Sequence, residues 1–100
     1  MSESSGGSRS DLGNVVLIGQ KPVMNYVIAA LTLFERGSKT IVIKARGKSI
    51  SRAVDTAEIL RRSFVSDAYV KDVKISTETF TVDNKTRSVS SIEITLSKQT

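Results

Sequence analysis

Residues 40–64 read TIVIKARGKSISRAVDTAEILRRSF, and this stretch decides the fold. Its first seven residues alternate: Ile41, Ile43 and Ala45 share one face, as in a strand that packs on a core. After Gly47, apolar residues recur at helical spacing as far as Phe64. The stretch therefore predicts a strand over residues 40–46 that turns at once into a helix, with Ser49 as its N-cap.

The preceding segment repeats this order. Residues 14–18, NVVLI, form a short apolar run typical of a strand buried on both faces. Residues 22–36 then carry apolar side chains at helical spacing, with Pro22 suited to the first helical position and Gly37 to the end. A strand-helix-strand-helix order predicts two parallel strands joined by a right-handed crossover, with both helices available to cover the sheet.

The last third of the chain changes period. Residues 73–79 and 92–97 alternate as strands do, and the segment VDNKTR between them contains the turn formers Asp83 and Asn84. We therefore expect two long strands joined as a hairpin. Residues 76–91 are rich in Ser and Thr and poor in large apolar groups, so this part of the hairpin is expected to project beyond the core.

The composition limits the class of protein. A chain of 100 residues with 39% apolar content suits one compact domain, which we place at residues 13–100 after a flexible tail at residues 1–12. No secretory signal or membrane span is evident, so we expect a cytoplasmic protein with no membrane partner. Without Cys and His, and with no catalytic motif, the chain is expected to be no enzyme and to need no metal or cofactor.

The positive charge is concentrated where strands turn into helices. The formal charge is +5, yet residues 14–62 alone carry +6. Both strand-to-helix turns follow parallel strands, so they should meet at one edge of the sheet, each presenting a helix N-terminus to an anion. Such an edge suits the phosphates of a nucleic acid rather than its base edges. Four cations gather at the second turn: Lys44, Arg46, Lys48 and Arg52.

Plainer interpretations stay open for several of these side chains. Charged residues on loops are often only solvated, and a hairpin tip with Lys85 and Arg87 is an ordinary polar turn. Tyr26 is either a core aromatic or a contact in a nucleic-acid groove. Phe64 is either a core residue or an exposed contact for another subunit.

A resemblance to a known family adds to this interpretation. The segments NVVLIGQKPVMNYVIAALTLF and IVIKARGKSISRAVDTAEILRRSF resemble the archaeal Alba family of small basic chromatin proteins. The similarity runs from about residue 14 to residue 98. It implies an α/β fold of the α+β sandwich type, β-α-β-α-β-β, with a four-stranded mixed sheet, two helices and a protruding hairpin. This fold is similar to that of the C-terminal domain of translation initiation factor three.

The resemblance also implies site residues. Phe64 matches an aromatic position that supports contacts between neighbouring dimers. Many relatives read GKKP in the first turn, with a lysine whose acetylation weakens DNA binding, whereas this chain has Gln20 there. We expect nucleic-acid binding by this chain to rely more on the second turn than it does in those relatives. The full set of residues expected to bind nucleic acid is Asn14, Gln20, Lys21, Tyr26, Lys44, Arg46, Lys48, Arg52, Lys85 and Arg87.

Three classes of function follow. The first is a chromosome-associated protein that coats and compacts double-stranded DNA without sequence preference and also binds RNA. It would act as a homodimer, or as a heterodimer with a paralogue, with dimer-dimer contacts on DNA. The second is a ribonucleoprotein subunit whose main ligand is RNA, because phosphate neutralisation serves both nucleic acids. The third is an enzyme or a pure protein-interaction subunit.

Overall fold

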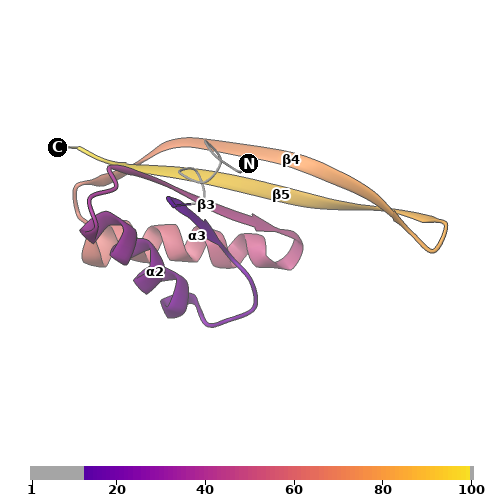
Figure 1. The fold of residues 1–100 in the computed structure, drawn as a ribbon, viewed down its shortest axis with the longest axis horizontal. Helices are drawn as coiled ribbons and strands as arrows, with labels where there is room; N and C mark the ends of the chain where they lie inside the picture. Colours follow the sequence, from indigo (N-terminus) through magenta and orange to yellow (C-terminus); the bar gives the residue numbers. More distant parts are fainter. Residues whose placement is uncertain (1–12, 100) are drawn as a thin grey trace.

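The computed structural model describes residues 13–99, in which the elements follow the predicted order (Figure 1). A 3-10 turn separates the second strand from the second helix, and a π-helical turn extends that helix. The predicted tail, residues 1–12, lies outside the described residues. The elements are β2 (Val15–Leu17), α2 (Val23–Glu35), β3 (Thr40–Arg46), η1 (Gly47–Ser49), α3 (Ile50–Ile59), η2 (Leu60–Phe64), β4 (Ala68–Val82) and β5 (Lys85–Lys98).

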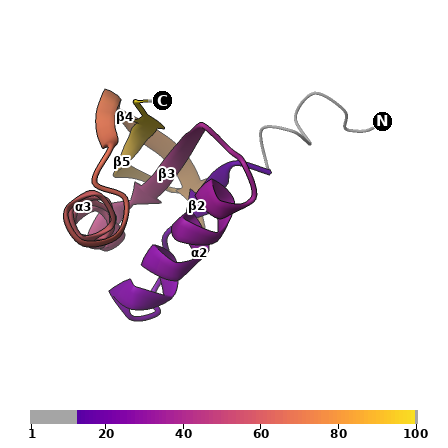
Figure 2. The same ribbon diagram turned by 90° about the vertical axis from the view of Figure 1, so that its left-hand side faces the viewer.

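The four strands form one mixed sheet in the order β2-β3-β5-β4. β2 and β3 are parallel, whereas β5 is antiparallel to both β3 and β4. Both helices lie on the same face of this sheet (Figure 2). The predicted alternation in β3 is confirmed, since Ile41, Ile43 and Ala45 are buried beneath the helices. The opposite face, which carries Lys44 and Arg46, is called the open face below.

The expectation that the first strand is buried on both faces is wrong. Val16 is only 5% exposed, but the next residue, Leu17, is 68% exposed. β2 lies at one edge of the sheet, and within residues 13–99 no helix covers its open face. A short apolar run does not distinguish an edge strand from a central one, and this explains the error.

The helix ends differ in detail from the prediction. Pro22 is the N-cap of α2 rather than its first helical residue. Ser49 does not cap α3 through its side chain, because its hydroxyl donates instead to the carbonyl of Gly19. The last turn is wider than an α-helix, with the amide of Val65 donating to the carbonyl of Leu60 at 2.8 Å. Neither helix of the described part is long and apolar enough to cross a membrane.

The hairpin projects from the sheet as predicted. β4 and β5 pair with one register shift, between Val70 and Asp72, and their outer part, residues 76–91, extends past the helices as an arm (Figure 1). Asp83 and Asn84 form its two-residue turn with φ values of 52° and 63°, the left-handed conformation that such hairpins require. The arm gives the described residues a long axis of 49 Å against 33 and 23 Å across.

Candidate nucleic-acid interface

The two strand-to-helix turns lie side by side, as expected from the parallel pairing of β2 and β3. The first turn is residues 18–22, and the second is residues 47–49. The carbonyl oxygen of Gly19 accepts a hydrogen bond from the Ser49 hydroxyl at 3.2 Å and another from Arg52 Nη1 at 2.7 Å. These two bonds join the turns into one surface at one end of the sheet. This surface, residues 18–22 and 47–49, is called the ledge.

Tyr26 supports the first turn from the core side. Its side chain is 9% exposed, and its hydroxyl oxygen accepts hydrogen bonds from the amides of Gly19 at 2.9 Å and Lys21 at 3.0 Å. A β-carbon on residue 19 would lie 3.1 Å from that oxygen, so a glycine permits the close approach. Of the two interpretations left open for Tyr26, the structure favours the core residue. Its hydroxyl positions the backbone of the first turn.

Replacing Tyr26 by Phe is expected to lower the free energy of unfolding by about 2 kcal/mol. The change removes only the hydroxyl oxygen and leaves two backbone amides without their acceptor. Urea unfolding followed by circular dichroism measures the loss. Tyr69→Phe is the matched control, because Tyr69 is 38% exposed and its hydroxyl makes no hydrogen bond within residues 13–99. Equal losses in both variants would contradict the role given to Tyr26.

The ledge carries exposed positive charge. Lys21 and Lys48 are both exposed, and neither forms an ion pair with any residue from 13 to 99. Gln20 is exposed beside Lys21. Neither α2 nor α3 has a side-chain cap or an acidic residue in its first turn, so both helix N-termini remain favourable to an anion. Two neighbouring turns can therefore receive two phosphates. Arg52 differs, because its guanidinium already binds the Gly19 carbonyl.

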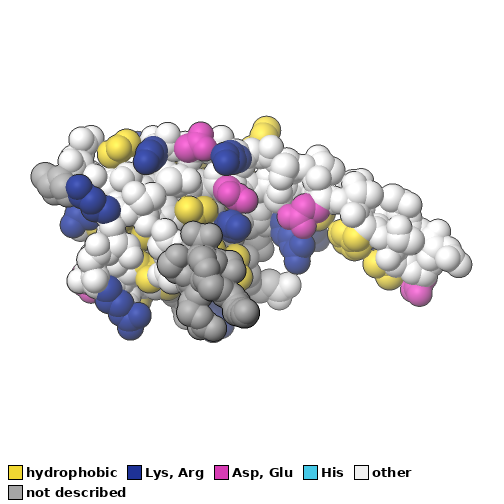
Figure 3. Space-filling model, turned by 45° about the horizontal axis from the view of Figure 1, so that its top comes forward, with side chains coloured by type: hydrophobic (Ala, Val, Ile, Leu, Met, Phe, Trp, Pro, Cys, Tyr) yellow, Lys and Arg dark blue, Asp and Glu magenta, His cyan; other side chains and the backbone are white. Residues whose placement is uncertain are grey.

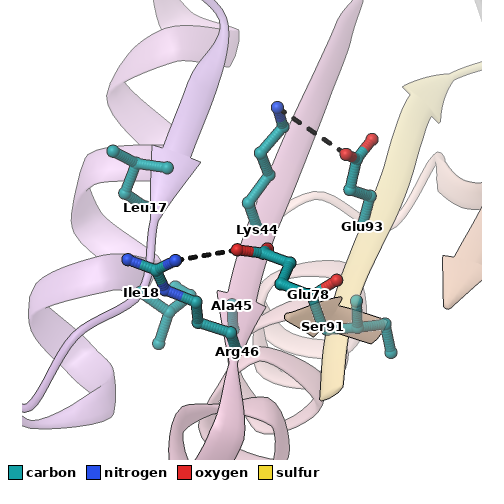
Figure 4. Close-up of a pocket in the computed structure, with 9 residues that line it drawn as sticks. Leu17, Ile18, Lys44, Ala45, Arg46, Glu78, Ser91 and Glu93 are labelled. Carbon is teal, nitrogen blue, oxygen red and sulfur yellow. Dashed lines mark hydrogen bonds and ion pairs between the residues drawn. The ribbon is translucent and has the colours of Figure 1, made fainter. Parts of the chain in front are cut away.

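Two other predicted residues carry acidic partners on the open face (Figure 4). Lys44 Nζ lies 3.7 Å from a carboxylate oxygen of Glu93, and Arg46 Nη1 donates to Glu78 Oε1 at 2.8 Å. Together with Leu17 they line a shallow groove of about 310 Å³. Basic and acidic side chains consequently lie close together over the sheet in Figure 3. The open face is less positive than the predicted set of cations indicated.

The arm leaves the sheet at the same end as the ledge. Arg46, the last residue of β3, is in register with Ser91, which in turn pairs with Ser76 at the base of the arm. The tip, with Lys85 and Arg87, is roughly 20 Å further out at the usual rise of a strand. The structure thus places the tip on the same side of the molecule as the ledge but does not bring the two together.

The arm has two chemically different faces. Residues paired directly across an antiparallel ladder point to the same side. Arg87 therefore shares a face with Phe80, and Lys85 with Val82, as a continuation of the open face. The opposite face carries only hydroxyl side chains along the outer arm: Thr77, Thr79, Thr81, Thr86, Ser88 and Ser90.

The two remaining predicted residues lie elsewhere. Asn14 precedes β2, and its side-chain amide donates to the carbonyl of Thr40 at 3.3 Å. It therefore lies at the end of the sheet opposite the ledge. Phe64 ends the π-helical turn and is 47% exposed beside Leu31 and Val65. Its exposure agrees with the second interpretation of this residue, a contact for another subunit.

Sequence reasoning missed the acidic partners. Glu78 and Glu93 lie within residues 63–100, where acidic and basic residues balance, so they gave no charge signal. The pairing within the arm can be counted outward from the turn at Asp83 and Asn84. The register between β3 and β5 has no such local marker, and only this register brings Glu78 near Arg46.

Comparisons with known proteins agree with this geometry. The Alba family profile matches residues 14–82. The DNA/RNA-binding protein Alba 1 of Archaeoglobus fulgidus is 56% identical over 86 residues, covering 86% of this chain and 97% of the relative. The DNA/RNA-binding protein Alba of Methanothrix thermoacetophila is 55% identical over 85 residues, covering 85% and 96%.

Solved structures show the same relationship. Alba from Thermoplasma volcanium has a TM-score of 0.80 and 49% identity, covering 85% of this chain and 100% of that structure. ALBA1 from Trypanosoma brucei has a TM-score of 0.69 and 27% identity, covering 85% and 68%. The resemblance inferred from the residues alone is confirmed, and the predicted fold class with it.

Proposed function

Because the chain belongs to the Alba family, we propose that it binds double-stranded DNA without sequence preference, and RNA as well, through backbone phosphates. The observation that carries this proposal is the ledge, where Lys21 and Lys48 stand exposed on two joined turns. Phosphate contacts of this kind position a protein on a duplex but read no sequence. The names of the relatives, DNA/RNA-binding proteins, support the binding of both nucleic acids. They give no support to an enzymatic activity.

The arm extends the binding surface beyond the ledge. Its open-face side presents Arg87 and Lys85 beside the apolar side chains of Phe80 and Val82. The tip of the arm lies roughly 20 Å from the ledge, a distance that spans about six phosphates along one strand of a duplex. One protomer would therefore touch the backbone at two places, with Arg46 between them. Tyr26, Arg52 and Asn14 would act on binding by holding the turns and β2 in place.

We propose that two copies associate through an apolar surface beside α3. Helix α3 packs on β3 and β5. The edge strand β4 lies beyond β5, outside the area that α3 covers. Apolar residues on the helix side of β4 therefore remain exposed, including Ile75 at 80%. A contiguous exposed apolar patch of this kind marks an interaction site. We call it the α3–β4 surface; it comprises the exposed residues Val54, Val70, Val73 and Ile75 and the half-buried Ile50, which lines a hollow with Ile75.

A dimer would double the number of phosphate contacts and place two arms on one nucleic acid. Phe64 is exposed away from the ledge, so it remains available to touch a neighbouring dimer. Successive dimers in contact would coat and compact DNA, and the protein would then be associated with the chromosome. The same surfaces serve RNA, and competition between duplex DNA and RNA for a labelled probe measures which ligand binds more tightly.

The salt dependence of binding tests this function. If a dimer contacts about six phosphates, log affinity should fall with log salt concentration at a slope of roughly −5. Fluorescence anisotropy of labelled duplexes of unrelated sequence, titrated at several salt concentrations, gives both slope and sequence preference. A slope near zero, or strong preference for one sequence, would contradict phosphate binding as the source of affinity.

A further inference from the structure

The ion pair between Arg46 and Glu78 joins the body of the protein to the arm. Arg46 is the last residue of β3, whereas Glu78 lies on β4, with β5 between them. Arg46 Nη1 and Glu78 Oε1 are 2.8 Å apart, the shortest of the ion pairs within residues 13–99. The pair therefore links a predicted phosphate-binding arginine to a strand that projects from the sheet.

Small residues between the two strands make this pair possible. The residue in register with Arg46 is Ser91, whose own partner on β4 is Ser76. The two serine hydroxyls lie 2.6 Å apart and so bond to each other rather than to the arginine. The Glu78 side chain can pass over these short side chains from the arm, and it meets the guanidinium of Arg46 on the β2 side of β3, as Figure 4 shows.

The arm base is also held against the second turn. Gly47 has a φ of +59°, and a β-carbon there would lie 3.1 Å from Val89 Cγ2. Val89 pairs directly with Glu78, so both point to the open face of the arm. Val89 therefore lies close to the second turn, and its strand partner Glu78 lies beside the ledge at the base of the arm.

We propose that Glu78 competes with nucleic-acid phosphate for Arg46 and thereby limits the affinity of the protein; this inference rests on the function proposed above. Carboxylate and phosphate are both oxyanions that suit a guanidinium, and a phosphate approaching Arg46 meets the negative charge of Glu78. Both side chains are exposed, at 66% for Arg46 and 47% for Glu78. Exposed pairs are weak, so a phosphate can replace the carboxylate. The exchange would also remove the ion pair that links the arm to β3.

Glu78→Gln is expected to strengthen binding of a random-sequence duplex by about two- to fivefold for each arginine released, the range set by a weak exposed pair. For a dimer the gain is the square of that, roughly four- to 25-fold. Glu93→Gln is the matched control, because it removes the same charge from the same face but its partner is Lys44. Its gain measures the loss of one negative charge together with the release of Lys44, and it should be smaller because that pair is longer, at 3.7 Å.

A double-mutant cycle with Arg46→Met separates competition from general electrostatics. In the Arg46→Met background, Glu78→Gln should increase affinity no more than Glu93→Gln does. An equal gain from Glu78→Gln with and without Arg46 would overturn the inference, as would weaker binding of the single variant. If the unaltered protein fails to bind the duplex at low salt, the proposed function itself fails. If the unaltered protein binds but the effects of Glu78→Gln and Arg46→Met on affinity are additive, only the competition between Glu78 and phosphate is rejected.

Discussion

Replacing Lys21 and Lys48 together by glutamine is expected to lower the affinity for duplex DNA by about a thousandfold at 0.1 M salt. In a dimer the double substitution removes about four phosphate contacts, each of which adds roughly 0.9 to the salt slope. Between 1 M and 0.1 M salt, four such contacts supply three to four decades of affinity. The slope itself should change from roughly −5 to roughly −2.

The control for this variant keeps the net charge equal and changes only the position of the charge. Lys39 and Lys71 lie near the starts of β3 and β4, at the end of the sheet opposite the ledge. Their double replacement by glutamine should leave most of the slope in place. Anisotropy titrations of both variants at four salt concentrations give the comparison. Equal loss of slope in the two variants would show that total charge, rather than the ledge, determines binding.

The elements of this fold could be predicted because their signals are local. The alternation in residues 40–46 and the helical spacing after Gly47 each lie within one segment. Asp83 and Asn84 mark the hairpin turn through their tolerance of positive φ. Parallel pairing of the first two strands followed from the strand-helix-strand order, and it brought both turns to one end of the sheet.

The contacts that shape the site could not be predicted, because they depend on how distant segments meet. Tyr26 and Arg52 had sequence neighbours that suited a nucleic-acid contact, yet packing directs both toward the backbone of the first turn. The pairing of Arg46 with Glu78 requires the β3–β5 register, for which the sequence offers no marker. The exposure of Leu17 depends on the position of β2 at the sheet edge.

The dimer proposal depends on the α3–β4 surface, and one residue tests it most sharply. Ile75 is 80% exposed in the isolated chain, so a polar residue there should not disturb the fold. In a two-fold dimer each copy of Ile75 would be buried, and this burial would stabilise the dimer by about 2 kcal/mol per copy. A charge in its place also has to be desolvated without a partner.

Ile75→Glu is therefore expected to weaken the dimer at least about a thousandfold, since two copies together lose about 4 kcal/mol. Sedimentation equilibrium should show the monomer mass at concentrations where the unaltered protein is dimeric. Ile28→Glu makes the same chemical change on the outer face of α2, where Ile28 is 58% exposed, and should leave the dimer intact. Because a monomer has half the phosphate contacts, Ile75→Glu should also roughly halve the salt slope. Dissociation by the Ile28 variant instead would place the partner on α2, and unchanged mass in both variants would reject the α3–β4 surface.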